Sequence, residues 1–143
     1  MSIITLTSDM GIKDFYLASI KGSIYKALPD AKIVDISHHI MPFDIAQAAF
    51  IVKNTYPDFP ENTIHIISVD PEPSLNSNHI VIFKSGQYFI GNDNGMFSLL
   101  FDEVPDQIWK LTPPENIGSS TFPSKSIFVW AASMLAQGSK LEE

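Results

Sequence analysis

The start of the chain holds the pattern that most constrains its fold, a strand followed by a helix and a second strand. The apolar, β-rich run 3–7 ends in a polar turn. Apolar residues recur at helical spacing over 14–28, before a stop at Pro29, and 32–36 is again β-rich. Such a unit is right-handed, with parallel strands, in nearly all known cases. We therefore expect an α/β fold.

The rest of the sequence continues this alternation and adds a hairpin. Further elements are expected as a helix over 42–54 with Asp44 at its start, a strand over 63–69, a hairpin of 79–83 and 87–90, a short helix over 96–101, a strand over 107–111 and a helix over 124–137. The hairpin requires antiparallel pairing. We expect a three-layer α/β/α fold with a mixed, mostly parallel sheet, and the 143 residues are enough for one domain.

Composition excludes several classes of function. The formal net charge of −7 opposes phosphate binding, so nucleic acid is not an expected partner. The chain has no cysteine, which excludes disulfides, thiolate metal sites and cysteine nucleophiles. It shows neither a signal-peptide pattern nor an apolar run long enough to span a membrane. We expect a cytoplasmic protein without membrane contact.

Polar side chains stand where the expected parallel strands end. Asp9, Asp35 with His38, Asp70 and the loop 92–95 occupy such positions, and α/β proteins bind ligands beyond these strand ends. An acid after a strand is also a common turn former or helix cap, so each residue alone is ambiguous. Glycine-rich phosphate loops are missing, and the adjacent His38 and His39 cannot both face one metal ion. No metal is expected.

Five motifs, taken together, are more specific. They are Thr5–Gly11 with Asp14, Tyr16, Lys21 and Gly22; Val34–His38; Val69–Pro71; Asp93–Gly95; and Thr121–Phe122. In order and spacing they resemble the N-terminal domain of the S-adenosylmethionine hydroxide adenosyltransferases, adenosine-forming hydrolases related to fluorinating and chlorinating enzymes. The resemblance implies nucleophilic displacement at C5′ of S-adenosylmethionine, which would be the substrate, with no further cofactor.

The resemblance also implies roles for individual residues. Asp9 matches the acid that holds the ribose, because a carboxylate can accept hydrogen bonds from both hydroxyls of a cis diol. Phe43 and Phe122 match aromatic walls of the site, and Asn94 belongs to a motif assigned to substrate binding. The catalytic candidates are Asp70 and Ser124, and Ser124 matches a serine that contacts halide in the halogenating relatives.

The first departure from the family pattern concerns the catalytic residues. The arginine expected after Asp70 and the histidine expected after Phe122 are both missing, although His79 or Lys125 could substitute. An altered hydrolase, a non-catalytic nucleoside-binding module and an oligomerisation domain therefore remain open. Halogenation is less favoured, because Asp70 would repel a halide ion.

The second departure concerns domains. Family members are expected to carry a C-terminal β-barrel domain and to form trimers. Residues 1–143 correspond only to the N-terminal domain, so we expect the barrel to be absent from this chain and the chain to form a homotrimer.

Overall fold

The computed structural model describes residues 3–9, 15–41, 44–69, 79–92, 96–101, 105–110 and 128–138, without the side chains of Tyr16, Asn92 and Met96. The elements are β1 (Ile3–Ser8), α1 (Tyr16–Ala27), β2 (Lys32–Ser37), α2 (Ile45–Thr55), the short 3-10 helix η1 (Tyr56–Asp58), β3 (Ile64–Ser68), β4 (His79–Lys84), β5 (Gln87–Asn92), α3 (Met96–Leu100), β6 (Gln107–Lys110) and α4 (Val129–Ala136). Each expected strand and helix is present, with ends that differ by a few residues. Residues 124–127 of the last expected helix lie outside the described residues.

The strands form a six-stranded sheet in the order β2-β1-β3-β5-β4-β6. β1 pairs in parallel with both β2 and β3, and β3 pairs in parallel with β5, whereas β4 is antiparallel to β5 and β6. The predicted mixed, mostly parallel sheet is therefore confirmed. The chain runs from β1 to β2 on one side, and β3 lies on the other side of β1. A crevice at the carboxyl ends of β1 and β3 follows from this reversal of strand order.

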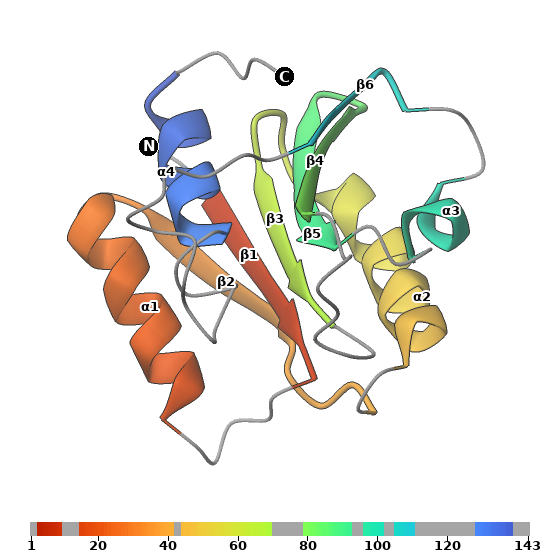
Figure 1. Cartoon of the computed structure of the whole chain (residues 1–143), viewed down its shortest axis with the longest axis horizontal. Helices are drawn as coiled ribbons and strands as arrows, with labels where there is room; N and C mark the ends of the chain where they lie inside the picture. Colours follow the sequence, from red (N-terminus) through yellow and green to blue (C-terminus); the bar gives the residue numbers. More distant parts are fainter. Residues whose placement is uncertain are drawn as a thin grey trace.

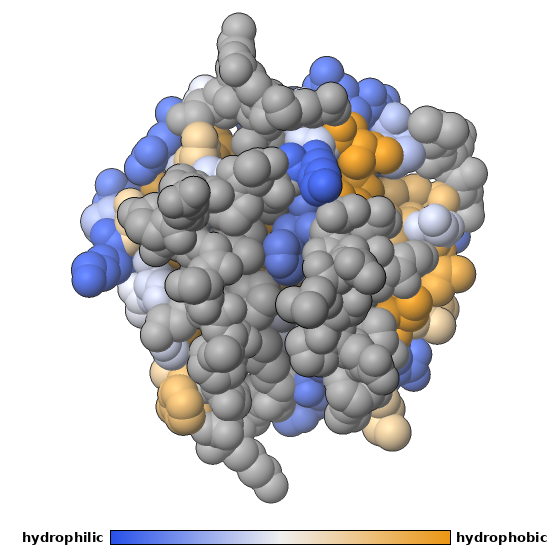
Figure 2. Space-filling model, viewed as in Figure 1, coloured by the Kyte–Doolittle hydropathy of each residue, from blue (hydrophilic) through white to orange (hydrophobic). Residues whose placement is uncertain are grey.

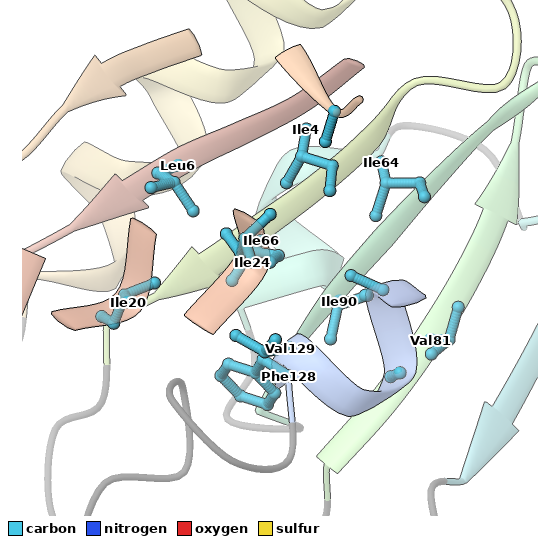
Figure 3. Packing of buried hydrophobic residues seen from close by; sticks show 13 residues of the cluster. Ile4, Leu6, Ile20, Ile24, Ile64, Ile66, Val81, Ile90, Phe128 and Val129 are labelled. Atoms are coloured by element: carbon cyan, nitrogen blue, oxygen red, sulfur yellow. The ribbon is translucent and has the colours of Figure 1, made fainter. Parts of the chain in front are cut away.

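Helices cover both faces of the sheet, which completes the three layers (Figure 1). Isoleucines of β1 and β3 pack against α1 and α4 in one hydrophobic cluster, where side chains from sheet and helices point toward one another (Figure 3). A second cluster joins the other face to α2 and α3. On the visible surface, hydrophobic side chains gather over α2 and α3 (Figure 2). None of the helices in the described ranges is long and apolar enough to cross a membrane.

Local sequence explains where the helices begin. The side chain of Asp44 accepts a hydrogen bond of 2.9 Å from the backbone N–H of Gln47, so the predicted N-cap is confirmed. α2 begins at Ile45, three residues later than expected, because Asp44 takes the capping position. The N-cap of α1 is Phe15, whose side chain makes no capping hydrogen bond.

Candidate functional site

A pocket lies at the carboxyl ends of β1 and β3, beneath α1. It is narrow, with room for about one water molecule. Its lining residues are Leu6, Thr7, Ser8, Leu17, Ile20, His38, Ile66 and Ser68. Isoleucine and leucine side chains thus meet the polar side chains that end the strands. This is the position at which the strand order of an α/β sheet predicts a ligand.

Asp9 follows β1 directly and lies in a bend at this end of the sheet, partly buried. Because Phe15 is the N-cap of α1, Asp9 does not cap that helix. The segment directly after Gly11, for which Asp9 was the alternative cap, lies outside the described residues. Asp9 itself is not among the residues that line the pocket, but it follows Ser8, which is one of them.

A chain of four polar side chains joins α1, β2 and β1 next to Asp9. Lys21 Nζ donates to Asp35 Oδ2 at 2.6 Å, and His38 Nε2 lies 2.8 Å from Asp35 Oδ1. Ser8 Oγ lies 2.6 Å from His38 Nδ1. An ionised carboxylate only accepts, so Nε2 of His38 donates to Asp35, and the Ser8 hydroxyl pairs with the other ring nitrogen, Nδ1. We name Lys21, Asp35, His38 and Ser8 the relay.

The charge of Asp35 is stabilised by its neighbours in the relay. Burial raises the pKa of Asp35, but hydrogen bonds from Lys21 and His38 outweigh that effect, and the pKa lies below its usual value. The carboxylate is therefore ionised at neutral pH and accepts from both partners.

The relay crosses an irregularity in the pairing of β1 with β2. Leu6 pairs with Asp35, but the next residue, Thr7, pairs with Ser37, so Ile36 has no partner in the register. A bulge of this kind bends the strand and re-aims the side chains after it. Here it precedes His38, which is 5% exposed, whereas His39 is exposed. The two histidines diverge, as the sequence predicted.

Most of the site residues expected from sequence fall outside the described residues. These are Phe43, Asp70, Asn94, Phe122 and Ser124, and also the possible substitute Lys125. Asp9 is the expected site residue that the structure does describe. No group of three acidic or histidine side chains that could hold a metal ion occurs in the described ranges.

His79, the other possible substitute for the missing histidine, is described. It is the first residue of β4, which lies between β5 and β6 in the sheet. Its imidazole ring meets Phe128 edge-on, with 5.4 Å between ring centroids. In the register it faces Asn92, the last residue of β5, so it stands at the same end of the sheet as Asp9.

Sequence analysis did not find the relay. Its members occur in the quoted motifs, but no contact between them was expected. The available signal was the spacing of Asp35 and His38, three residues apart at the end of a strand, together with a serine at the end of the neighbouring strand. Parallel strands bring such ends together.

Two threonines of β1 give a matched pair for a stability prediction. Thr7 is 1% exposed, and its hydroxyl has no hydrogen-bond partner in the part of the chain that the structure describes. Thr5 is also buried, but its hydroxyl lies 2.7 Å from Nδ1 of His65. An unpaired buried hydroxyl destabilises the folded state, whereas a paired one does not.

Thr7→Val is therefore expected to raise the free energy of unfolding by about 1 kcal/mol. Thr5→Val should lower it by about 1–3 kcal/mol, because His65 then loses its donor. Urea unfolding of the two variants and the wild type measures both effects. A loss of stability in Thr7→Val as large as that in Thr5→Val would show that the Thr7 hydroxyl has a partner.

Comparisons with known proteins identify the family. The family model described as the SAM hydroxide adenosyltransferase N-terminal domain matches residues 4–143. An (R)-S-adenosyl-L-methionine hydrolase of Methanocaldococcus jannaschii is 37% identical over 134 residues, which cover 90% of this chain and 51% of that protein. A protein with the same name from Salinispora arenicola is 29% identical, covering 98% of this chain and 55% of the relative.

A solved structure agrees with these sequence matches. The crystal structure of an uncharacterized conserved protein from Thermotoga maritima superimposes with a TM-score of 0.88 at 29% identity, and the match covers 99% of this chain and 56% of that one. The chain spans about half the length of the relatives it matches. On the family model, the hydrolase relatives and the shared fold, the chain belongs to the S-adenosylmethionine hydroxide adenosyltransferase family.

Proposed function

We propose that this chain binds S-adenosylmethionine and takes part in its hydrolysis to adenosine and methionine. The observation that carries the proposal is the position of Asp9, a carboxylate at the end of β1, beside the crevice where the strand order reverses. The (R)-S-adenosyl-L-methionine hydrolase relatives support the choice of substrate. Membership of the family supports the same reaction.

The chemistry suits a site that provides orientation more than acid catalysis. An oxygen of water forms a bond to C5′ and gives up one proton to a base, the C5′–S bond breaks, and its electron pair stays on sulfur. The products are adenosine, one proton and methionine with a neutral thioether. The leaving group needs no proton, but water is a weak nucleophile and must be oriented and partly desolvated. Asp9 would hold the ribose through its two hydroxyls. The net charge of −7 weakly favours the approach of a sulfonium cation.

Neither described histidine near this end of the sheet fits the role of the missing family histidine. Both ring nitrogens of His38 have partners, and the side chain is almost fully buried. His79 lies three strands from β1, or roughly 14 Å at the usual spacing between strands. A base for water must be within hydrogen-bond reach of it. We assign water activation to Asp70, with Ser124 as the second catalytic candidate, and expect slow turnover because a carboxylate is a weak base at neutral pH.

The experiment is a calorimetric titration of S-adenosylmethionine into the chain, followed by chromatography of the products. Equal amounts of adenosine and methionine, formed in proportion to protein, support the hydrolase. Binding without products would support the alternative, a nucleoside-binding module that lacks the family arginine and histidine. No binding at all would overturn both. A fresh aliquot heated to unfold the protein controls for spontaneous decay of the substrate.

We also propose that the chain acts as a homotrimer in the cytoplasm, in line with the family resemblance and the lack of cysteine. Sedimentation equilibrium of the chain, with and without adenosine, tests the trimer. A monomer under both conditions would contradict it.

A further inference from the structure

We propose that the relay of Lys21, Asp35, His38 and Ser8 is a positioning device that fixes Asp9 at the end of β1. The relay joins three elements, because Lys21 belongs to α1, Asp35 to β2 and Ser8 to β1. His38 bridges the two strands through its two ring nitrogens. Ser8 is the last residue of β1 and is followed directly by Asp9.

The order of groups resembles a serine nucleophile with its base and its acid, but the exposure of the side chains argues against that role. Ser8 is 5% exposed and the His38 side chain 4%, whereas the side chain of Asp35 is 40% exposed. A nucleophile must be open to its substrate, and the orienting acid of a triad is buried. In this chain the order of exposure is the reverse, with a buried serine and a partly exposed aspartate. The buried hydroxyl is the anchored end, and the exposed ion pair is the end that holds the ring.

The pairing of β1 with β2 shows what the relay adds at this point, a side-chain link between the two strands. β2 is an edge strand, with mostly exposed or half-exposed residues. Its regular pairing with β1 is interrupted between Leu6 and Thr7, two residues before the end of β1. On its other side β1 pairs regularly with β3 as far as Ser8, but toward β2 the register beyond the interruption holds only the pair of Thr7 with Ser37. The bond between Ser8 and His38 provides a connection across the strands beyond this interruption.

The relay holds the His38 ring by a hydrogen bond at each of its two nitrogens, and this restrains the ring. The lowered pKa of Asp35 keeps an ionised acceptor opposite His38. That acceptor holds the N–H at Nε2, and the Ser8 hydroxyl holds the opposite ring nitrogen, Nδ1, at 2.6 Å. Each group thus orients the next one, as outer partners orient the ligands of a designed or natural site. The backbone of Asp9, the next residue after Ser8, is thereby held in position at the end of β1.

The test compares variants at the buried and exposed ends of the relay with matched controls. Ser8→Ala removes the hydroxyl and Ser8→Thr keeps it. His38→Asn breaks the bridge, and His39→Asn is its control at the exposed neighbouring histidine. Lys21→Met cuts only the outer bond of the relay, so it remains informative if a buried variant does not fold; Lys26→Met, near the end of the same helix, is its control.

The first readout is nuclear magnetic resonance of the 15N-labelled chain, and it does not depend on any ligand. The wild type should show a His38 ring protonated at Nε2, and Ser8→Ala should shift its Nδ1 signal. The order parameter of the Asp9 amide should fall from about 0.85 to below about 0.7 in Ser8→Ala and His38→Asn, and less in Lys21→Met. Ser8→Thr and both controls should match the wild type. An unchanged Asp9 amide in the folded variants would overturn the proposal.

The second readout rests on the proposed function. The Kd for adenosine should rise about tenfold in Ser8→Ala and His38→Asn, and return to near the wild-type value in Ser8→Thr. The rate of conversion of bound S-adenosylmethionine should change less than this affinity. If the wild type fails to bind adenosine, the proposed function fails, while the order parameters still decide whether the relay fixes Asp9. Normal adenosine affinity in variants with a mobile Asp9 would contradict the positioning role.

Discussion

Lowering the pH from 7 to 4 is expected to reduce the free energy of unfolding by about 3 kcal/mol through His65 alone. His65 is the second residue of β3, is 0% exposed and stacks on Phe89 with 4.8 Å between ring centroids. Burial lowers its pKa from 6.5 to about 4, although the hydrogen bond with Gln87 opposes this shift. The native ring is therefore neutral at pH 7.

The hydrogen bonds around His65 show why a second proton is excluded. The amide nitrogen of Gln87 lies within hydrogen-bond distance of the carbonyl oxygens of Tyr56 and Phe59, so its side-chain oxygen is left to accept from Nε2 of His65. Nδ1 accepts from the Thr5 hydroxyl at 2.7 Å. Protonation of Nδ1 would require the Thr5 hydroxyl to turn its own proton away, and it would place a charge among buried rings.

The direction of the pH dependence follows from proton binding. Between pH 6.5 and 4 the unfolded chain binds a proton at His65 and the native chain does not, so stability falls as the pH falls. The contribution is complete above pH 6.5 and is lost through this window. Urea unfolding at several values between pH 7 and 5 measures the slope before most carboxylates begin to titrate.

A variant isolates the contribution of His65 from those of other groups. His65→Asn should be less stable at pH 7, because the network is broken, but its stability should depend less on pH over the same range. His39→Asn, at an exposed position, should leave the slope unchanged. Equal slopes in the wild type and His65→Asn would show that His65 titrates normally in the native state.

His65 also illustrates what the sequence could and could not predict. The near-continuous apolar run 63–69 predicted a strand buried on both faces, and β3 is one, with Ile64, Ile66 and Ile67 at 1% exposure. Periodicity identifies strands and faces because burial is repeated along the chain. It does not identify the partner of a polar side chain, since that partner stands 60 residues away on β1 in the case of Thr5.

The candidate site likewise combines features that the sequence predicted with features that it did not. The end of β1 as a ligand-binding position was predicted from one strand–helix–strand unit, because parallel strands end at the same edge. The order of the strands, and so the neighbours of Asp9, was not predicted. Helical spacing placed Lys21 within α1, but its ion pair with Asp35 depends on how the helix packs on the sheet. Contacts of this kind require three-dimensional packing, which a local pattern does not contain.

Asp9→Ala is expected to weaken adenosine binding about 100-fold without a comparable loss of stability. In the proposed complex the carboxylate accepts two charge-assisted hydrogen bonds from the ribose, and the loss of both costs about 3 kcal/mol or more. Asp9 lies in a bend outside the sheet and does not cap α1, so its removal leaves the core intact. Calorimetric titration with adenosine measures the affinity, and Asp30→Ala, at an exposed turn, is the control.

The ligand provides a second control for the same contact. 2′-Deoxyadenosine lacks one of the two hydroxyls, so the wild type should prefer adenosine about tenfold or more, and Asp9→Ala should lose most of that preference. A double-mutant cycle of this kind separates direct contact from a general change in the pocket. If Asp9→Ala weakens both nucleosides equally, Asp9 shapes the site without touching the ribose. If it weakens neither, the ribose is held elsewhere, and the end of β1 is not the binding site.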